Sequence, residues 1–202
     1  MQTRFVATRA VSTSLPRGLE PVHIQRAVDF IEDHVAELVE LYFEQANVFS
    51  AVVGIFGTRA LDSVSPYKRH KHPDIAQQRF PDLSLNGRLN PAPEQALESK
   101  ASTRAWAVQS HYDHPGWYIV WRYLVDPTKS IKADRVVVIW RVDIAFLEKS
   151  DWKYEASTAS SGGGGRTHTF GLKRPAEKLR GRQACALSGV RLRNGKPVLV
   201  GD

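Results

Sequence analysis

Two apolar runs in the second half of the chain constrain its fold more than any other feature. They are "WYIVWRYLV" (117–125) and "RVVVIWRVDIAFL" (135–147), and both are rich in β-branched and aromatic residues. Such residues favour strands, and a near-continuous apolar run is typical of a strand that is covered on one or both faces. Both runs are shorter than the roughly 20 residues that a membrane-spanning helix needs. We therefore expect two central strands of a sheet and no membrane-spanning segment.

Two helical segments are expected in the N-terminal part of the chain. From Ile24 onwards, apolar residues recur at the spacing of one helix face, whereas the acids fall on a different face. The apolar set is Ile24, Ala27, Val28, Ile31, Val35, Leu38 and Tyr42, and the acidic set is Asp33, Glu37, Glu40 and Glu44. This pattern predicts an amphipathic helix over residues 22–46. Residues 47–64 are interpreted as a second, more buried helical or mixed segment.

The middle of the chain is expected to form a pair of strands over residues 82–86 and 95–101. The Asn86-Gly87 turn and a proline-containing stretch separate these two segments. Residues 102–112 fit a short helix. Helices, strands, a helix and further strands follow one another, which favours an α/β (α+β) fold with a central mixed β-sheet flanked by helices.

The C-terminal part is expected to be irregular at first. Residues 150–171 are predicted to be a loop because they contain four successive glycines. A short helix is expected to start at Pro175, and a hairpin is expected around Asn194-Gly195. The predicted organisation is an N-terminal arm (1–21), a core (22–150) and a basic C-terminal region (151–202) within the same compact domain.

The positive charge of the chain is concentrated near its C-terminus. Residues 166–202 hold nine lysines and arginines against two acids, so their net charge of +7 equals that of the whole chain. A neutral core with one basic surface suits a polyanionic partner, most commonly nucleic acid. The lone Cys185 rules out an internal disulfide and fits a reducing compartment, so we expect a cytoplasmic protein.

An acidic pair and a lysine are expected to meet on the two strands of the middle segment. Side chains alternate along a strand, so Glu98 and Lys100 share one face, which we expect to be solvent-facing. If the two strands pair, Asp82 can lie beside Glu98. Two carboxylates together suit a hard cation such as Mg²⁺, with Mn²⁺ as a substitute. Lys100 can then orient the attacking water or stabilise the charge that develops on phosphorus.

Pro81-Asp82 followed by Glu98-Ser99-Lys100 resembles the signature of the PD-(D/E)XK nuclease superfamily, which includes many type II restriction endonucleases. The resemblance implies a restriction-endonuclease-like core, with an αβββαβ order. It also implies that Asp82 and Glu98 bind a divalent metal and that Lys100 assists the attacking water. The alternative interpretation is a surface hairpin in which Lys100 forms a cross-strand salt bridge.

Other residues compete for roles in this site. Pro73-Asp74 is a second Pro-Asp pair, but no strand pattern follows it. An acid from the first helix, Glu40 or Glu44, is a candidate for completing the site. Gln109 and Tyr112 hint at a Gln and a Tyr that exonuclease-like branches carry on the following helix, although their spacing is one residue short. A zinc site is a further alternative, and its candidate ligands are His70, His72, His111, Asp113 and His114.

The residues expected to contact DNA come after the core in the sequence. Cations and hydroxyls contact phosphates, and Arg also reads guanine in the major groove. The candidates are Lys153, Arg166, Thr167, His168, Thr169, Lys173 and Arg174. The alternative interpretation of this segment is a linker whose positive charge has no role in binding.

Together these features predict a Mg²⁺-dependent endonuclease that acts on double-stranded DNA as a homodimer, because a two-fold protein matches a symmetric site. The alternatives are a non-catalytic nucleic-acid-binding protein and a repair or RNA-processing nuclease with the same core.

Overall fold

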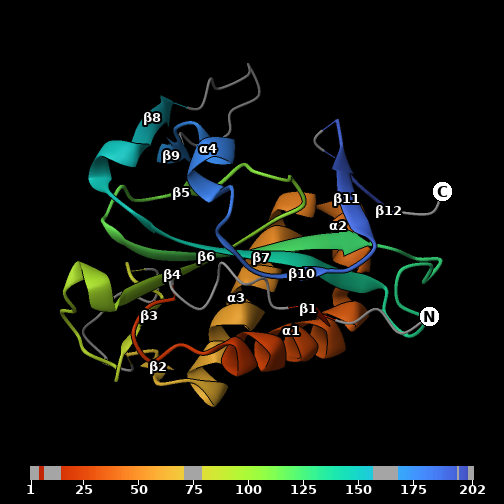
Figure 1. The fold of residues 1–202 in the computed structure, drawn as a ribbon, viewed down its shortest axis with the longest axis horizontal. Helices are drawn as coiled ribbons and strands as arrows, with labels where there is room; N and C mark the ends of the chain where they lie inside the picture. The colour runs from red at the N-terminus through yellow and green to blue at the C-terminus, as the bar shows by residue number, and fades with distance from the viewer. Residues whose placement is uncertain (1–4, 7–14, 71–78, 157–167, 195, 200–202) are drawn as a thin grey trace.

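A mixed sheet crosses the molecule from one side to the other (Figure 1). The computed structural model describes residues 5–6, 15–70, 79–156, 168–194 and 196–199. Within these residues, seven strands form the sheet in the order β1-β10-β7-β6-β4-β3-β2. Only β4 and β6 pair in parallel. The strands are β1 (Phe5–Val6), β10 (Gln183–Leu187), β7 (Val137–Leu147), β6 (Gly116–Val125), β4 (Ala96–Ser102), β3 (Leu83–Leu85) and β2 (Tyr67–Lys68).

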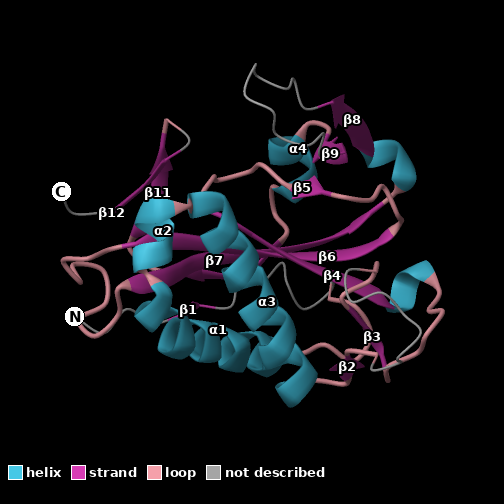
Figure 2. Ribbon diagram, turned by 180° about the vertical axis from the view of Figure 1, so that it is seen from behind, coloured by secondary structure: helices cyan, strands magenta, loops and turns pink. Residues whose placement is uncertain are grey.

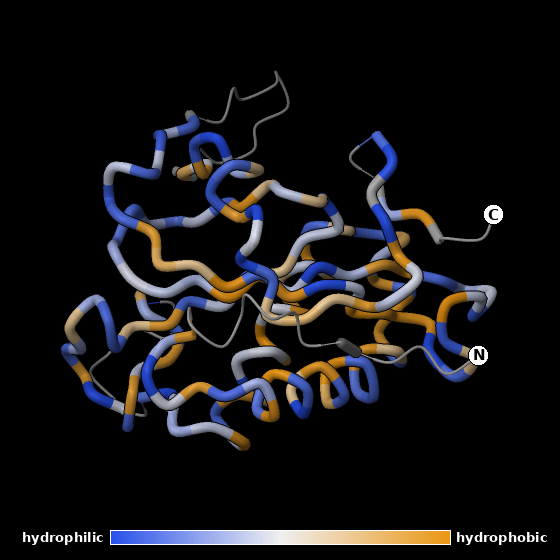
Figure 3. Tube along the Cα trace, viewed as in Figure 1, coloured by the Kyte–Doolittle hydropathy of each residue, from blue (hydrophilic) through white to orange (hydrophobic). Residues whose placement is uncertain are grey.

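The two apolar runs form the long central strands β6 and β7, as the sequence predicts. Their side chains alternate between two cores. Ile119 and Trp121 pack with the helices on one face, while Tyr118 and Val120 belong to a second cluster on the other face. Because both faces are covered, nearly every residue of these strands is buried. In Figure 3 the middle of the molecule is accordingly coloured mainly as hydrophobic.

A layer of helices covers one face of the sheet (Figure 2). It consists of α1 (Pro21–Val35), the short 3-10 turn η1 (Ala36–Leu38), α2 (Glu40–Glu44) and α3 (Ala46–Val64). Proline at the first helical position and a capping box between Glu20 and His23 start α1. The single helix expected over 22–46 is therefore wrong in detail, since η1 divides it. The second segment is entirely helical, and it begins after Gln45 leaves helical geometry with φ −145° and ψ 80°.

A three-stranded sheet and a short helix lie over the other face. The sheet has the order β5-β9-β8, with β5 (Gln109–Ser110), β9 (His168–Leu172) and β8 (Trp152–Ala156). The loop expected over residues 150–171 is thus corrected, because its described ends include the paired strands β8 and β9. The helix α4 (Pro175–Leu179) begins at the predicted proline. The remaining 3-10 turns are η2 (Pro93–Gln95) and η3 (Lys149–Asp151).

The short helix expected over residues 102–112 does not form. Arg122 donates hydrogen bonds to the carbonyls of Arg104 (2.9 Å), Ala107 (2.6 Å) and Trp106 (3.1 Å). Arg141 donates to the carbonyl of Ala105. In a helix these four carbonyls would accept hydrogen bonds from residues 108–111. Two buried guanidinium groups therefore bind the backbone groups that a helix would use, and the segment runs as a loop into β5.

The predicted terminal hairpin is present as β11 (Val190–Arg193) and β12 (Lys196–Leu199), which pair in antiparallel fashion. In Figure 1 it projects beyond the edge of the central sheet. The strand before it, β10, is part of that sheet, so the C-terminal region contributes to the central layer. Across the described ranges, the structure contains no helix that is long and apolar enough to cross a membrane.

Candidate active site

The antiparallel pairing of β3 and β4 brings Asp82 beside Glu98. Leu83 lies opposite Leu97 and Ser84 opposite Ala96, so the next pair along is Asp82 and Glu98. The backbone N–H of Asp82 donates to Oε2 of Glu98 at 3.1 Å. In return, the N–H of Ser99 donates to Oδ2 of Asp82 at 2.9 Å. Each carboxylate is therefore held by the backbone of the other strand.

Lys100 completes the cluster that we call the acid–lysine site, which is Asp82, Glu98 and Lys100. Its Nζ lies 2.6 Å from Oε1 of Glu98. The side chain of Ser99 points the other way, because its hydroxyl donates to the carbonyl of Gly54 in α3. Glu98 and Lys100 therefore lie on the face of the sheet opposite to the helical layer, as the strand alternation predicts.

This face is not open to solvent as the sequence led us to expect. Glu98 is only 4% exposed, and the side chain of Lys100 is 23% exposed. On the neighbouring strand β6, Tyr118 lies opposite Glu98 and Val120 opposite Lys100, and both belong to the buried cluster on this face. Tyr118 packs on Trp152 of β8 with 5.0 Å between ring centroids. A strand pattern gives the face of a side chain, but it does not reveal what later segments lay over that face.

Burial and mutual repulsion shift the titration of the site. Burial raises the pKa of Glu98, the charge of Asp82 raises it further, and the result is about 7 despite the opposing effect of Lys100. Burial likewise raises the pKa of Asp82, against the charge of Lys100. For Lys100, burial lowers the pKa but the two carboxylates outweigh it, so its pKa is raised. At neutral pH the site thus holds a charged lysine and an acidic pair that is costly to ionise fully.

The composition of the site is compatible with Mg²⁺. Within the described part of the chain, no group of three or more His, Cys, Asp or Glu residues could hold a metal ion. However, Mg²⁺ is commonly held by one or two carboxylates, with waters and substrate phosphates completing its coordination. Asp82 and Glu98 offer hard oxygen atoms of this kind, and their raised pKa values indicate a pair that a cation would stabilise.

The other acids and histidines proposed from sequence do not join the site. Glu40 and Glu44 are exposed on or next to α2, within the helical layer on the opposite face, and α2 lies far from β3 in Figures 1 and 2. The prediction that Glu40 or Glu44 completes the site is therefore wrong. Gln109 lies on a strand rather than a helix, with its side chain bonded to Glu155 at 3.4 Å.

The alternative of a zinc site has no counterpart among the described residues, which include His70, His111, Asp113 and His114. His72 and Asp74 lie outside the described residues.

The candidate DNA-contacting residues that the structure describes lie in the second layer, on the same face as the acid–lysine site. Lys153 is exposed on β8 and pairs with Glu155 at 2.9 Å. Lys173 and Arg174 are exposed just before α4. Thr169 donates to the carbonyl of Glu155 at 3.1 Å, so its hydroxyl serves the β8–β9 pair. His168 begins β9, whereas Arg166 and Thr167 lie outside the described residues.

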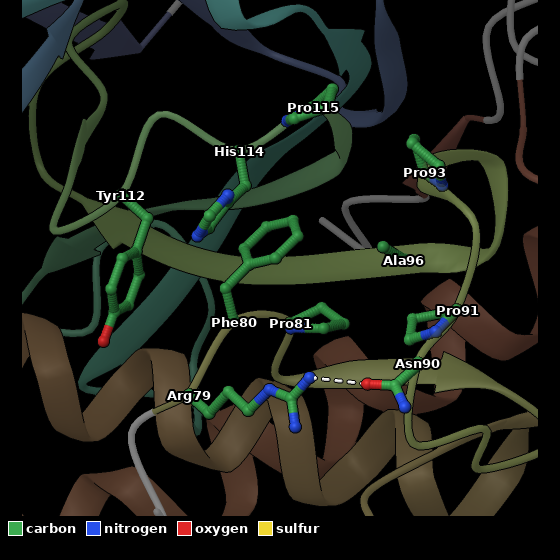
Figure 4. A pocket seen from close by; sticks show the side chains of 10 residues that line it. All are labelled: Arg79, Phe80, Pro81, Asn90, Pro91, Pro93, Ala96, Tyr112, His114 and Pro115. Atoms are coloured by element: carbon green, nitrogen blue, oxygen red, sulfur yellow. Dashed lines mark hydrogen bonds between the residues drawn. The ribbon is translucent and has the colours of Figure 1, made fainter.

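A pocket beside the acid–lysine site was not foreseen from the sequence. It has a volume of about 490 Å³ and is shown in Figure 4. The lining residues are Arg79, Phe80, Pro81, Asn90, Pro91, Pro93, Ala96, Tyr112, His114 and Pro115. The signal in the sequence is the density of prolines and rings on either side of the Pro-Asp pair, which only the fold brings to one place.

Comparison with protein-family models, with curated proteins and with solved structures found no match. The functional argument therefore depends on the chemistry of the residues that the fold brings together.

Proposed function

We propose that the protein is a Mg²⁺-dependent endonuclease that hydrolyses phosphodiester bonds of double-stranded DNA, with a restriction-endonuclease-like core and a basic DNA-contacting extension. The observation that carries the proposal is the acid–lysine site. Two strands place two carboxylates and an ammonium group together in the motif Pro81-Asp82 and Glu98-Ser99-Lys100. Each carboxylate accepts a backbone N–H of the opposite strand, and Nζ of Lys100 lies 2.6 Å from Glu98. An isolated cross-strand salt bridge would need only one of these carboxylates.

In this proposal Asp82 and Glu98 hold the ion, which lowers the pKa of a bound water and neutralises charge on the phosphate. The backbone N–H groups of Asp82 and Ser99 fix the orientation of the two carboxylates. Lys100 lies on the same face and carries its charge next to Glu98. Its Nζ orients the attacking water or stabilises the negative charge that develops on phosphorus.

The location of the cations supports DNA as the substrate. Lys153, Lys173 and Arg174 lie on the layer that covers the face of Glu98, so a duplex lying along this layer could contact them while one phosphate reaches the acid–lysine site. Sequence-specific cleavage as a homodimer belongs to the same proposal, because a two-fold dimer matches a symmetric DNA site.

Incubation of the protein with supercoiled plasmid, with and without Mg²⁺, tests the proposal. We expect nicked or linear DNA only when Mg²⁺ is present, and sequencing of the ends should give one recurrent cut sequence. Binding without cleavage would favour a non-catalytic nucleic-acid-binding protein, and scattered ends or cleavage of RNA would favour a repair or RNA-processing nuclease.

A further inference from the structure

The pocket in Figure 4 has a wall of aromatic rings. The centroids of Phe80 and His114 lie 5.0 Å apart, and those of Tyr112 and His114 lie 5.4 Å apart with nearly parallel planes. Phe80 also packs against Tyr118 at 6.1 Å, which anchors the wall to the central sheet. The planes of Phe80 and His114 are tilted by 40° and those of Tyr112 and His114 by 25°, so the wall offers ring faces on which a planar ligand can stack.

The remaining walls combine rigid apolar groups with one polar pair. Four prolines line the pocket, and their fixed φ angles favour a preformed shape. On one side the guanidinium of Arg79 donates to Oδ1 of Asn90 at 2.8 Å (Figure 4). This contact orients the amide of Asn90, which lines the pocket and carries an NH₂ donor beside the bonded oxygen. A planar, apolar ligand with hydrogen-bond acceptors on its edge matches these groups.

The pocket adjoins the acid–lysine site. Pro81 lines it and directly precedes Asp82, and Ala96 lines it on the same side of β4 as Glu98. Tyr112 also lines the pocket, and after Glu98 and Asp82 it adds to the raised pKa of Lys100. A nucleotide with its phosphate at the acid–lysine site is therefore well placed to direct its base toward the pocket.

We propose that this pocket receives one unpaired base of the DNA strand whose phosphate lies at the acid–lysine site. The base would stack on the wall of Phe80, His114 and Tyr112, and Asn90 would donate to an acceptor on its edge. Enzymes that act on DNA hold extruded bases in pockets of this kind, between aromatic or apolar side chains. The inference rests on the proposed function, since it takes DNA as the substrate of the same site.

The test separates base contacts from phosphate contacts. We would measure, in Ca²⁺, the affinity of the protein for a thymidine octamer and for an octamer of the same length whose sugars carry no bases. Both probes have the same phosphates, so only the first can stack. Loss of one stacked base typically weakens binding by roughly 5- to 150-fold. We expect the wild-type protein to prefer the thymidine octamer by a factor in this range.

The variants Tyr112→Ala and Phe80→Ala should reduce that preference severalfold each. Tyr112 is 36% exposed, so its replacement leaves the core intact even if Phe80→Ala lowers stability. The matched control is Phe43→Ala, an exposed ring on α2 that should leave the preference unchanged.

Equal wild-type affinity for the two probes, or a preference that survives in both pocket variants, would overturn the inference. Plasmid cleavage measured in parallel distinguishes the two proposals. Cleavage without a base preference would contradict the proposed base-binding pocket and leave the nuclease proposal in place. A base preference without cleavage would contradict the nuclease proposal and support the pocket. A protein that binds neither octamer and leaves the plasmid intact would overturn both.

Discussion

At the scale of single residues, Glu98 accounts for most of the behaviour that we expect of the site. Its carboxylate is buried, receives the N–H of Asp82 and pairs with Lys100, yet it stands beside a second carboxylate. Such a group stores unfavourable electrostatic energy that a cation or a proton relieves. A residue placed for stability alone would avoid this arrangement. We therefore expect the titration of Glu98 to be visible in the stability of the protein.

The first prediction concerns pH and uses a metal-free protein with a chelator present. The pKa of Glu98 is about 7 when folded, compared with a usual value of 4.5, so the folded state binds more protons between these values. Stability therefore falls as pH rises through this window. Relative to the wild type, Glu98→Gln should gain unfolding free energy between about pH 4.5 and 7 and level off above. Denaturant unfolding at several pH values measures this, and a constant difference would contradict the assigned pKa.

The second prediction concerns metal binding. If Asp82 and Glu98 share an ion, saturating Mg²⁺ or Ca²⁺ should raise the melting temperature at pH 8 without DNA, because an ion that binds only the folded state stabilises it. Glu98→Gln should lose the larger part of that increase. The matched control is Glu94→Gln, an exposed acid in η2 that should respond like the wild type. Identical metal responses in all three proteins would argue against a preformed ion site.

At the scale of elements, the position of β4 depends on how closely α3 approaches the sheet. A Cβ on Gly57 would lie 2.1 Å from Nε1 of Trp121, whereas one on Gly54 would meet nothing closer than 3.7 Å. The same indole nitrogen donates to the hydroxyl of Ser99 at 2.9 Å. Ser99 stands between Glu98 and Lys100, so the packing of α3 helps to position the acid–lysine site from the opposite face.

The third prediction compares these two glycines. Gly57→Ala should destabilise the protein by about 1–3 kcal/mol, because the indole of Trp121 must move in a packed core. Gly54→Ala should be nearly neutral, since the added methyl group meets only ordinary contacts and alanine favours a helix. Thermal or denaturant unfolding measures both. A Gly57→Ala variant as stable as the wild type would show that α3 does not constrain the sheet in this way.

The fourth prediction concerns the segment before α4. Lys173 and Arg174 are exposed, so replacing both by Ala should leave the fold intact. Each phosphate neutralised contributes about 0.9 to the slope of log affinity against log salt concentration. The double variant should therefore lower that slope by roughly 1–2 and weaken binding to cognate and random duplexes alike. A wild-type slope and affinity would mean that this segment does not touch DNA.

The sequence predicts elements where the local pattern decides the structure, and it fails where distant groups decide. The central strands follow from their apolar, β-branched runs, and the paired strands of the site follow from the turn between them. Side-chain alternation then fixes the relative faces of Glu98 and Ser99. The helix expected over residues 102–112 fails because Arg122 and Arg141 bind its carbonyls. Those arginines stand inside apolar runs, where a buried guanidinium needs many acceptors, but the sequence does not identify them.

At the scale of the whole molecule, the two faces of the central sheet are covered by different elements. One face packs on α1 and α3 and holds most of the core, whereas the other carries the acid–lysine site below the layer of β5, β8, β9 and α4. Apart from β5, that second layer comes from the basic C-terminal part of the chain. The acid–lysine site and the exposed Lys153, Lys173 and Arg174 are therefore on the same side of the sheet.

The central claim is that Asp82, Glu98 and Lys100 cleave a phosphodiester bond, and single-turnover cleavage of one mapped duplex by site variants tests it most directly. Asp82→Asn, Glu98→Gln and Lys100→Met should each slow cleavage in Mg²⁺ by at least about 100-fold, while the Glu94→Gln control cuts at the wild-type rate. DNA binding in Ca²⁺, measured in parallel, should persist in Lys100→Met. Cleavage at the wild-type rate by Glu98→Gln or Lys100→Met would contradict the account.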